Sequence, residues 1–265
     1  MGSESGQFLI SRVAVVIPSC DEYSDLWASQ ISSLRLRWSA CPFEICLISN
    51  YVRCAERGIS AITVGVDRGW AANLMKGLAA VPSDYVLLFL DDLYLTKDVD
   101  NEKLTQIIRC AVACDWEYLR LNPTPPPPTL SSAGAFAVGR IPAGDHYRAS
   151  TVLTLWKKSV LLDVLNPHEN AWQFEIFGSQ RTDKYEEWFA CSSWNLPYDN
   201  LVVKGKVDPR ALRRIKSSGI EVRTSRPIMR NHELFVLRLR ESRSALFSFV
   251  PRRIRRRIRT LFAAQ

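Results

Sequence analysis

Two adjacent carboxylates, Asp91 and Asp92, interrupt the apolar stretch YVLLFLDDLYL at residues 85–95. Burying an ionised carboxylate without a partner is costly, and two neighbouring carboxylates also repel each other. A divalent cation would neutralise the pair, because Mg²⁺ and Mn²⁺ prefer carboxylate oxygens and keep positions open for phosphate. We therefore expect Mg²⁺ or Mn²⁺ here. The simpler alternative is that one Asp caps the next helix and the other faces solvent.

The segments around this pair alternate between strand and helix patterns. Apolar or β-branched runs predict strands at residues 12–18, 43–49, 61–66, 84–90 and 116–122, and helical spacing predicts helices at 25–38, 70–81 and 101–114. Continuous apolar strands between helices indicate a mainly parallel sheet covered on both faces, an α/β fold of Rossmann-like type. Ligands bind such sheets at the carboxyl ends of the strands, where Asp91 and Asp92 stand.

A proline-rich segment, NPTPPPPT at residues 122–129, ends this alternation. Its four consecutive prolines favour a stiff, extended connector, and a loop or hairpin follows up to residue 146. Beyond it we expect strands at 150–156 and 201–207 and helices at 157–165, 171–181 and 208–219. The last helix begins with Asp208 as its N-cap and Pro209 in its first turn, and it ends at Gly219.

The order and spacing of these motifs resemble the GT-A glycosyltransferases, particularly the large inverting family 2. The first strand ends in Pro with an acid soon after, a Gly and an Asn stand four residues apart before a helix, and a later strand ends in an acidic motif. The matching positions are Pro18, Glu22, Gly69, Asn73, Asp91 and Asp92. The resemblance covers roughly residues 12–190. It implies one domain over residues 1–233, with a nucleotide-sugar half (12–121), the connector and loop (122–146) and an acceptor half (147–233).

The resemblance also implies site residues. The expected donor-binding residues are Pro18, Cys20, Glu22, Asn50, Asp67, Gly69, Asn73 and Asp91, and the expected metal ligands are Asp91 and Asp92. Arg68 could contact the nucleotide phosphates, or it could be solvated together with Asp67. Family members usually carry Asp-x-Asp, whereas this chain has Leu93 in the third position. Either aspartate could therefore hold the metal, with the other near the ribose.

An inverting transfer needs a general base for the acceptor hydroxyl. The family places this acid at the start of a helix, and residues 155–181 resemble that region. This implies Glu175 as the base, with Glu169 as the second choice. The competing interpretation is that Glu175 is a helix-face carboxylate paired with Arg181 or Lys184.

Other residues of the second half are candidates for the acceptor side. Trp172 and Glu169 are expected to contact the acceptor, since Trp near a sugar site often supplies a stacking surface, although Trp on an apolar stripe is more often core. Trp156 is a weaker candidate of the same kind. His232 stands where some GT-A enzymes have a late metal-binding His.

The net charge of +8 lies entirely in the C-terminal tail. Nine arginines and one glutamate follow residue 237, interleaved at helical spacing with apolar residues such as Ile254, Ile258 and Leu261. The remainder of the chain is neutral, which argues against a nucleic-acid partner. A basic amphipathic tail over residues 234–265 favours an anionic membrane. The alternative is that its first helix packs on the domain and its last residues are disordered.

Seven scattered cysteines without CxxC pairs indicate buried free thiols in a reducing cytosol. The first residues lack a secretory signal, and no apolar run approaches the ~20 residues of a membrane-spanning helix. We therefore expect a cytoplasmic enzyme, peripheral on the inner face of the cell membrane.

The function that the resemblance implies is a metal-dependent, inverting, hexosyltransferase-like glycosyltransferase. It would use a nucleotide-sugar donor and a glycan or lipid-linked acceptor in the synthesis of cell-surface polysaccharide or glycolipid. A sugar nucleotidyltransferase is one alternative, although the segment PSCDEYSD lacks the basic, Gly-rich phosphate loop that such an enzyme needs. The other alternative is a non-catalytic binding protein on a decayed transferase fold, which Leu93 keeps open.

Overall fold

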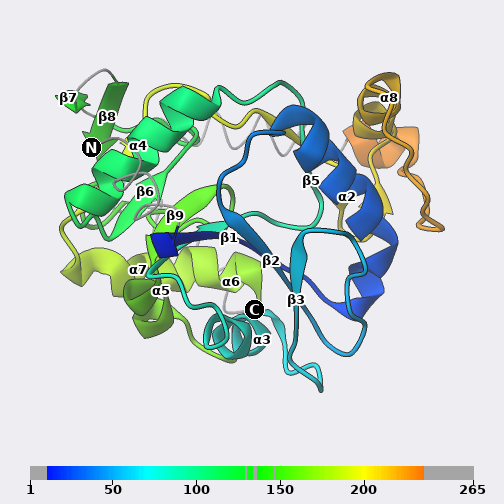
Figure 1. The fold of residues 1–265 in the computed structure, drawn as a ribbon, viewed down its shortest axis with the longest axis horizontal. Coiled ribbons are helices and arrows are strands. Elements are labelled where there is room, and N and C mark those ends of the chain that lie inside the picture. The colour runs from blue at the N-terminus through cyan, green and yellow to red at the C-terminus, as the bar shows by residue number, and fades with distance from the viewer. Residues whose placement is uncertain (1–10, 129, 134–135, 146, 236–265) are drawn as a thin grey trace.

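The computed structural model describes residues 11–128, 130–133, 136–145 and 147–235, and within these ranges the chain forms a mixed sheet of nine strands (Figure 1). In spatial order the strands are β3 (Ile59–Thr63), β2 (Glu44–Ser49), β1 (Val13–Pro18), β4 (Tyr85–Leu88), β9 (Thr154–Lys157), β6 (Tyr118–Arg120), β10 (Trp188–Cys191), β8 (Phe136–Arg140) and β7 (Ser131–Ala133). Seven of these nine described strands share one direction, and β9 and β8 oppose them. The expectation of a mainly parallel sheet is confirmed.

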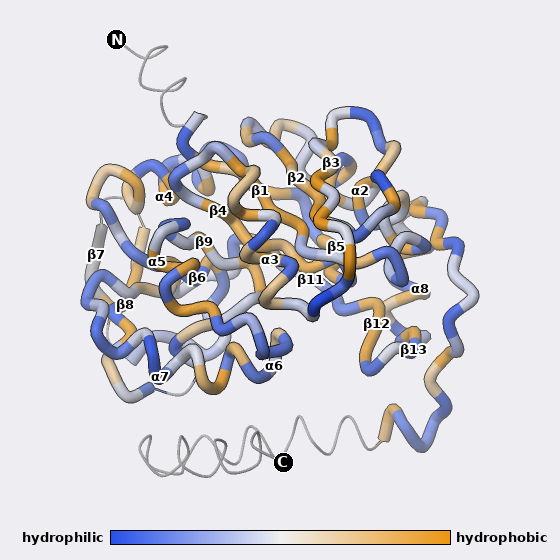
Figure 2. Tube along the Cα trace, turned by 90° about the horizontal axis from the view of Figure 1, so that it is seen from below, coloured by the Kyte–Doolittle hydropathy of each residue, from blue (hydrophilic) through white to orange (hydrophobic). Residues whose placement is uncertain are grey.

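Helices cover both faces of this sheet. Val13, Val15 and Ile17 of β1 pack in one cluster with α2 (Ser24–Arg37) and α4 (Asn101–Ala113). Ala14 and Val16 point the other way, toward α3 (Trp70–Leu78) and α5 (Lys158–Val164). Figure 1 shows α4 on one side of the sheet and α3 with α5 on the other, and Figure 2 shows apolar residues concentrated along the central strands. Burial on both faces explains the continuous apolar runs of these strands.

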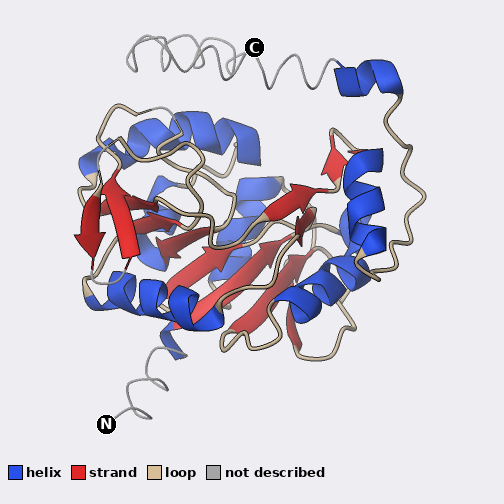
Figure 3. Cartoon of the chain, turned by 90° about the horizontal axis from the view of Figure 1, so that it is seen from above, coloured by secondary structure: helices blue, strands red, loops and turns tan. Residues whose placement is uncertain are grey.

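Smaller elements complete the described part of the chain. They are η1 (Asp21–Tyr23), β5 (Leu93–Leu95), α6 (Ala171–Gln173), the π-helical turn η2 (Phe174–Gly178), α7 (Ser179–Arg181), η3 (Thr182–Lys184), β11 (Tyr198–Asn200), β12 (Val202–Val203), β13 (Lys206–Val207) and α8 (Pro209–Ser217). Strand β5 pairs antiparallel with β11, and α8 packs with Leu26 and Tyr94 in a separate apolar cluster. Figure 3 shows α8 at the margin of the molecule, outside the large sheet.

The predicted elements differ from the observed ones at several places. The strand expected at 201–207 is a hairpin of β12 and β13, because Lys204 and Gly205 both adopt positive φ angles (52° and 73°), as the turn of a tight hairpin requires. The strand expected at 61–66 is observed as β3 at Ile59–Thr63, and the strand expected at 84–90 is observed as β4 at Tyr85–Leu88. The helix expected at 171–181 is interrupted by the π-helical turn η2. The loop or hairpin expected before residue 146 contains the antiparallel pair β7 and β8.

The cysteines and the helices bear on two further expectations. All seven cysteines lie in the described ranges and are free thiols, as predicted; Cys46, Cys54 and Cys191 are buried, but Cys114 is exposed, so burial was wrong for that residue. Among the described residues, no helix combines the length and the hydropathy that crossing a bilayer requires. The basic tail predicted for residues 234–265 falls outside the described residues from position 236 onward.

Candidate active site

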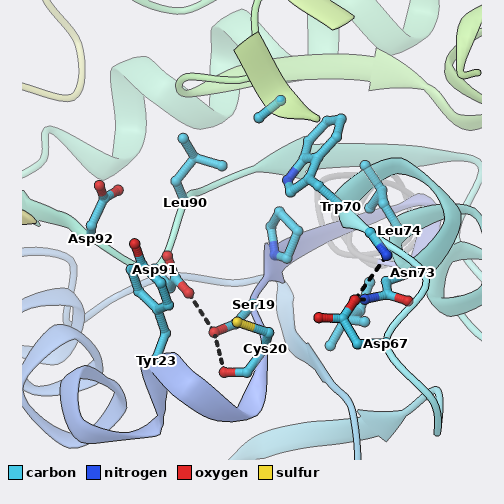
Figure 4. A pocket seen from close by; sticks show the side chains of 14 residues that line it. Ser19, Cys20, Tyr23, Asp67, Trp70, Asn73, Leu74, Leu90, Asp91 and Asp92 are labelled. Carbon is cyan, nitrogen blue, oxygen red and sulfur yellow. Dashed lines mark hydrogen bonds between the residues drawn. The ribbon is translucent and has the colours of Figure 1, made fainter. Parts of the chain in front are cut away.

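A pocket of about 280 Å³ opens where β1 and β4 end and α3 begins (Figure 4). The two strands are parallel neighbours, so Pro18 at the end of β1 lies beside the segment that carries Asp91 and Asp92 beyond β4. The residues that line it are Pro18, Ser19, Cys20, Tyr23, Ile48, Asp67, Gly69, Trp70, Asn73, Leu74, Leu90, Asp91, Asp92 and Ala171. Sequence-distant motifs therefore meet at the carboxyl edge of the sheet, as the fold predicted.

A short chain of hydrogen bonds holds the Asp91 carboxylate in place. The carboxylate is buried, and Ser19 donates its hydroxyl to Asp91 Oδ2. The Trp27 indole in turn donates to the Ser19 hydroxyl at 2.8 Å. The sequence analysis missed Ser19, although a small hydroxyl residue directly after the last residue of β1 is well placed to contact a group that follows β4. Ser19 therefore fixes one oxygen of Asp91 in the wall of the pocket.

The two aspartates share an environment that disfavours their charges. Burial, and then the neighbouring charge of Asp92, raise the pKa of Asp91 to about 7. Burial raises the pKa of Asp92 to about 6. Among the described residues, no Lys or Arg forms an ion pair with either aspartate; the nearby Arg226, which lowers both pKa values, pairs with Asp25 instead. A bound cation would relieve this penalty.

The turn before α3 explains the spacing of Gly69 and Asn73. Gly69 has a φ of +93°, a conformation that side chains rarely adopt, and it forms the N-cap of α3. Asp67 Oδ1 accepts the Gly69 N–H and the Asn73 amide, both at 2.8 Å, and Asn73 Oδ1 accepts the Arg68 N–H at 3.1 Å. Figure 4 shows Asp67 and Asn73 side by side in the pocket wall. These residues shape the turn that faces the aspartates.

Of the two acids after β1, Asp21 rather than Glu22 connects the strand ends. Asp21 Oδ1 accepts the backbone N–H groups of Asn50, Tyr51 and Val52 at 3.0–3.1 Å. Asn50, which follows β2, is buried and accepts the Asp21 N–H in return. Glu22 is exposed and does not line the pocket, whereas Cys20 does. The sequence pattern located an acid here but selected the neighbouring residue.

A segment from the far end of the chain supports the same wall. The Arg226 guanidinium lies over the Tyr23 ring at 4.0 Å and donates to both oxygens of Asp25 at 3.1 Å. It also donates to the backbone carbonyl of Glu22. Tyr23 lines the pocket, and its pKa is raised by burial and then by Asp91. Sequence reasoning missed Tyr23 and Arg226, because nothing local relates positions about two hundred residues apart.

Glu175 lies in the π-helical turn η2. Its Oε1 accepts the Ser150 hydroxyl at 2.9 Å, the Thr151 N–H at 2.8 Å and the Thr151 hydroxyl at 3.1 Å. The competing interpretation, a helix-face ion pair of Glu175, is wrong because Arg181 pairs with Glu169 and Lys184 pairs with Asp163. π-Helical turns occur frequently at functional sites, because the extra residue redirects a side chain.

The other acceptor-side candidates have distinct surroundings. Glu169 is buried, and Arg181 Nη1 donates to its Oε1 at 2.8 Å. Trp172 is exposed next to Ala171, which lines the pocket, whereas Trp156 is fully buried in the core. His232 is exposed and is not among the residues that line the pocket.

Tyr198 lies within the electrostatic influence of Glu175 and of Asp92. Its pKa is raised by burial, then by the charge of Glu175 and then by that of Asp92, so both carboxylates lie within electrostatic reach of one ring. Tyr198 begins β11, which pairs with β5 immediately beyond Asp92, and the Leu201 N–H donates to the Asp92 carbonyl at 2.9 Å. The structure therefore brings the predicted base and the predicted metal ligands to one region.

The residues of the pocket can be compared with those of known divalent-cation sites. No group of three or more His, Cys, Asp or Glu side chains that could hold a metal occurs within the described residues. Mg²⁺ and Mn²⁺ sites built for phosphorylated substrates commonly use one or two carboxylates, and phosphate oxygens and water complete the shell. Asp91 and Asp92, with raised pKa values and no paired cation among the described residues, fit this arrangement.

The strand order and the acidic turn after β4 define a GT-A fold, and a solved structure supports it. The chain is similar to the Staphylococcus aureus protein TarS, fragment 1–349, in complex with UDP-GlcNAc, with a TM-score of 0.50, 11% identity and coverage of 84% of this chain and 69% of that one. In another structure of the same fragment, this chain covers 59% of its length, at a TM-score of 0.44. At this identity the likeness establishes the fold.

Weaker likenesses extend to two other proteins. Mannosyl-3-phosphoglycerate synthase from Rubrobacter xylanophilus matches at a TM-score of 0.46 and 12% identity, covering 82% of this chain and 74% of that one. A cytidylyltransferase from Leptospira borgpetersenii matches at 0.44 and 10%, covering 81% and 98%. No protein-family model and no curated protein sequence matches the chain.

Proposed function

We propose that this protein is a glycosyltransferase that moves a sugar from a nucleotide-sugar donor to a glycan or lipid-linked acceptor with inversion, in cell-surface polysaccharide or glycolipid synthesis. The observation that carries the proposal is the pair Asp91 and Asp92 at the ligand-binding edge of a GT-A fold, with Asp91 buried, Asp92 partly buried, and no ion-paired cation among the described residues. A group with raised pKa values in a pocket is a functional-site candidate. The TarS fragment that shares this fold was solved with UDP-GlcNAc, which is consistent with a nucleotide-sugar donor.

In this proposal, each part of such a donor is assigned to a part of the pocket. The nucleoside would occupy the space between Cys20 and the turn at Asp67, and the diphosphate would lie toward the two aspartates. Asp91 and Asp92 would hold Mg²⁺ or Mn²⁺, which supplies positive charge to the departing nucleoside diphosphate. We leave open which of the two carboxylates is the closer ligand.

Glu175 is the proposed general base. It would take the proton from the attacking acceptor hydroxyl, whose oxygen forms a bond to the anomeric carbon as the bond from that carbon to the diphosphate oxygen breaks. The three hydrogen bonds to Oε1 fix the carboxylate, so Oε2 is the oxygen suited to receive the proton. Trp172 remains a proposed acceptor contact. Glu169 is retained as an acceptor-side residue that acts through its position, because Arg181 engages its carboxylate.

The test is a screen of nucleotide sugars for hydrolysis by the full chain, in the presence of Mn²⁺ or of a chelator. We expect one donor to be hydrolysed with Mn²⁺ and not with the chelator. Failure of every donor, in a folded protein, would contradict the enzymatic proposal and favour a non-catalytic binding protein. Formation of a nucleotide sugar from a sugar phosphate and a nucleoside triphosphate would instead identify a nucleotidyltransferase. The residues that line the pocket include no Lys or Arg to hold a triphosphate, which favours the glycosyltransferase.

We further propose that the basic tail attaches the enzyme to the inner face of the cell membrane. The support is its sequence: the nine arginines after residue 237, spaced among apolar residues, each gain about 1 kcal/mol near anionic lipid. Removing residues 251–265 should release the protein from phosphatidylglycerol vesicles without changing donor hydrolysis. Neutral phosphatidylcholine vesicles are the control. Unchanged binding to anionic vesicles would contradict the attachment.

A further inference from the structure

The ligand-binding edge of the sheet continues beyond the donor pocket. β4, β6 and β10 run in the same direction, so their carboxyl ends reach the same edge, and the opposed strand β9 begins there. Asp92 follows β4, Asn122 follows β6 and the loop of residues 192–197 follows β10. Thr151, which precedes β9, holds Glu175 at this edge. The loop 192–197 therefore lies at the same edge of the sheet as the proposed base.

This loop has a fixed backbone. The buried Asn122 accepts the N–H groups of Asn195 and Leu196 at 3.1 and 3.0 Å, and its amide donates to the Leu196 carbonyl at 2.7 Å. Asn195, also buried, donates its amide to the Leu121 carbonyl at 2.7 Å. A side chain from the end of β6 thus bonds to the loop, and a side chain of the loop bonds back to the backbone at the end of β6. A group that the loop carries needs little further ordering before it binds a ligand.

The group that the loop carries is an exposed indole. Trp194 is 52% exposed, which is unusual for the largest apolar side chain. Its ring centroid lies 6.3 Å from that of Tyr198, with the two planes at 49°. Tyr198 is half-buried, and the charges of Glu175 and Asp92 both act on it. Tyr198 lies in β11, whose partner strand β5 directly follows Asp92. The two rings therefore form an aromatic surface beside the end of the sheet that carries Asp92.

The surroundings of this surface match a sugar better than a purely apolar ligand. Aromatic rings provide a large, rigid contact area at a small entropic cost, and they suit partners with one apolar face and a polar rim. The neighbours of Trp194 along the loop that are not fully buried, Ser192 and Ser193, are polar. A pyranose presents an apolar C–H face to an aromatic ring and directs its hydroxyls toward such neighbours.

We propose that Trp194 and Tyr198 form a subsite that stacks on a sugar ring of the acceptor and directs its attacking hydroxyl toward Glu175. This inference rests on the proposed glycosyltransferase function and deepens it, because it assigns the bound end of the acceptor to a carbohydrate ring. A lipid carrier, where one is present, then extends away from the aromatic surface.

The test uses the full chain on an array of neutral, acidic and amino-sugar oligosaccharides, with donor hydrolysis measured in parallel. We expect Trp194→Ala to weaken binding to the preferred oligosaccharide at least ~10-fold, and Trp194→Phe to restore part of it, because one aromatic ring is retained. Phe235→Ala is the matched control, since Phe235 is 62% exposed and lies in the segment after α8. Both Trp194 variants should keep the melting temperature and donor hydrolysis of the parent chain.

Three results would overturn the subsite: no saccharide bound by the parent protein, equal binding by Trp194→Ala, or an equal loss in Phe235→Ala. Saccharide binding that depends on Trp194, in a parent protein that hydrolyses no donor, would refute the proposed transferase and leave the sugar subsite standing. If Trp194→Ala fails to fold, Trp194→Phe decides: unchanged affinity together with unchanged selectivity among the oligosaccharides overturns the stacking role. A reduced affinity at an unchanged melting temperature supports it.

Discussion

The carboxylates at the two halves of the sheet edge have opposite surroundings. On the proposed donor side, the buried Asp91 and the partly buried Asp92 are adjacent, and their pKa values are raised to about 7 and about 6. On the acceptor side, Glu175 receives three hydrogen bonds from Ser150 and Thr151. The aspartates have no ion-paired Lys or Arg among the described residues, whereas Glu175 Oε1 is already satisfied by protein donors.

In the proposed transferase, this difference would separate two tasks. A site that binds a metal and a diphosphate gains from carboxylates that the folded protein leaves uncompensated, because the ligand supplies the missing charge. A base must instead keep one fixed orientation before and after the acceptor arrives. The predictions below test whether the two halves are as independent as this contrast implies.

The largest effect is expected for Glu175→Gln. Loss of a general base typically costs about 10²- to 10⁴-fold in rate, so transfer should fall by that factor. Donor binding should be unchanged, because Glu175 lies outside the donor pocket. Rapid-quench measurement of transfer, beside calorimetric measurement of donor affinity, checks both. Asp163→Asn, which removes an exposed carboxylate paired with Lys184, is the control. Transfer at the parent rate would show that Glu175 is not the base.

Asp92→Asn should produce the complementary defect. We expect Mn²⁺-dependent donor affinity to fall by about 100-fold, since a carboxylate ligand and its charge are both lost. The fold should be retained, because the substitution preserves the side-chain shape and relieves repulsion with Asp91. Electron paramagnetic resonance of Mn²⁺ measures the metal directly, and Asp91→Asn measured in parallel identifies the closer ligand. Full Mn²⁺ affinity in both variants would show that the metal does not bind at Asp91 and Asp92.

The pH dependence of the free energy of unfolding tests the raised pKa values of Asp91 and Asp92. The folded pKa values of both aspartates lie above the ordinary value of 3.8, so ionisation disfavours the folded state. Their contribution to stability is full below pH ~4 and is lost as the pH rises through about 6 and 7. Each pKa unit by which folding shifts a carboxyl group changes the free energy of unfolding by ~1.4 kcal/mol.

The metal-free protein should therefore lose more stability between pH 5 and pH 8 than Asp91→Asn does. Denaturant unfolding at a series of pH values measures the slope. Asp98→Asn is the control, because the Asp98 side chain is 79% exposed. Identical slopes for the parent protein and Asp91→Asn would contradict the raised pKa values.

A smaller effect is expected for Arg226→Ala. Arg226 lies over the Tyr23 ring and lowers the pKa of both aspartates, so its removal should raise those values further and loosen the pocket wall. We expect a loss of donor affinity of about 3- to 10-fold, and an apparent pKa for metal binding that moves upward. Arg223→Ala is matched, because Arg223 pairs with the exposed Glu221. Equal effects of the two variants would mean that Arg226 has no specific role.

The sequence predicted β1 and β4 well because these strands are buried on both faces. Val13 to Ile17 and Tyr85 to Phe89 are fully excluded from solvent, and their composition records this. The short strands β10 and β11 were missed, since WFAC and YDN have three or four residues and no alternating pattern. The π-helical turn at Glu175 was also invisible, because it leaves the helical composition unchanged.

For the site, the sequence predicted which motifs would meet but not how they are supported. Asp91, Asp92, Gly69 and Asn73 line one pocket because strand order brings them together. Ser19 and Arg226 act through contacts of 72 and about 200 positions of separation, which no local pattern encodes. The contact of Asp21 with the end of β2 was not foreseen for a related reason, because which acid faces β2 depends on the geometry of the 3₁₀ turn η1. The donor role predicted for Glu22 stays a prediction.

The central claim is that the acidic pair, a divalent cation and a nucleoside diphosphate form one binding unit. Calorimetric titration of the parent protein with UDP, GDP, CDP and dTDP, with Mn²⁺ and then with a chelator, tests it most directly. The account predicts that at least one nucleotide binds with Mn²⁺ and that the chelator abolishes this binding. Equal affinity in the chelator, or no binding of any nucleotide by the folded protein, would contradict the account.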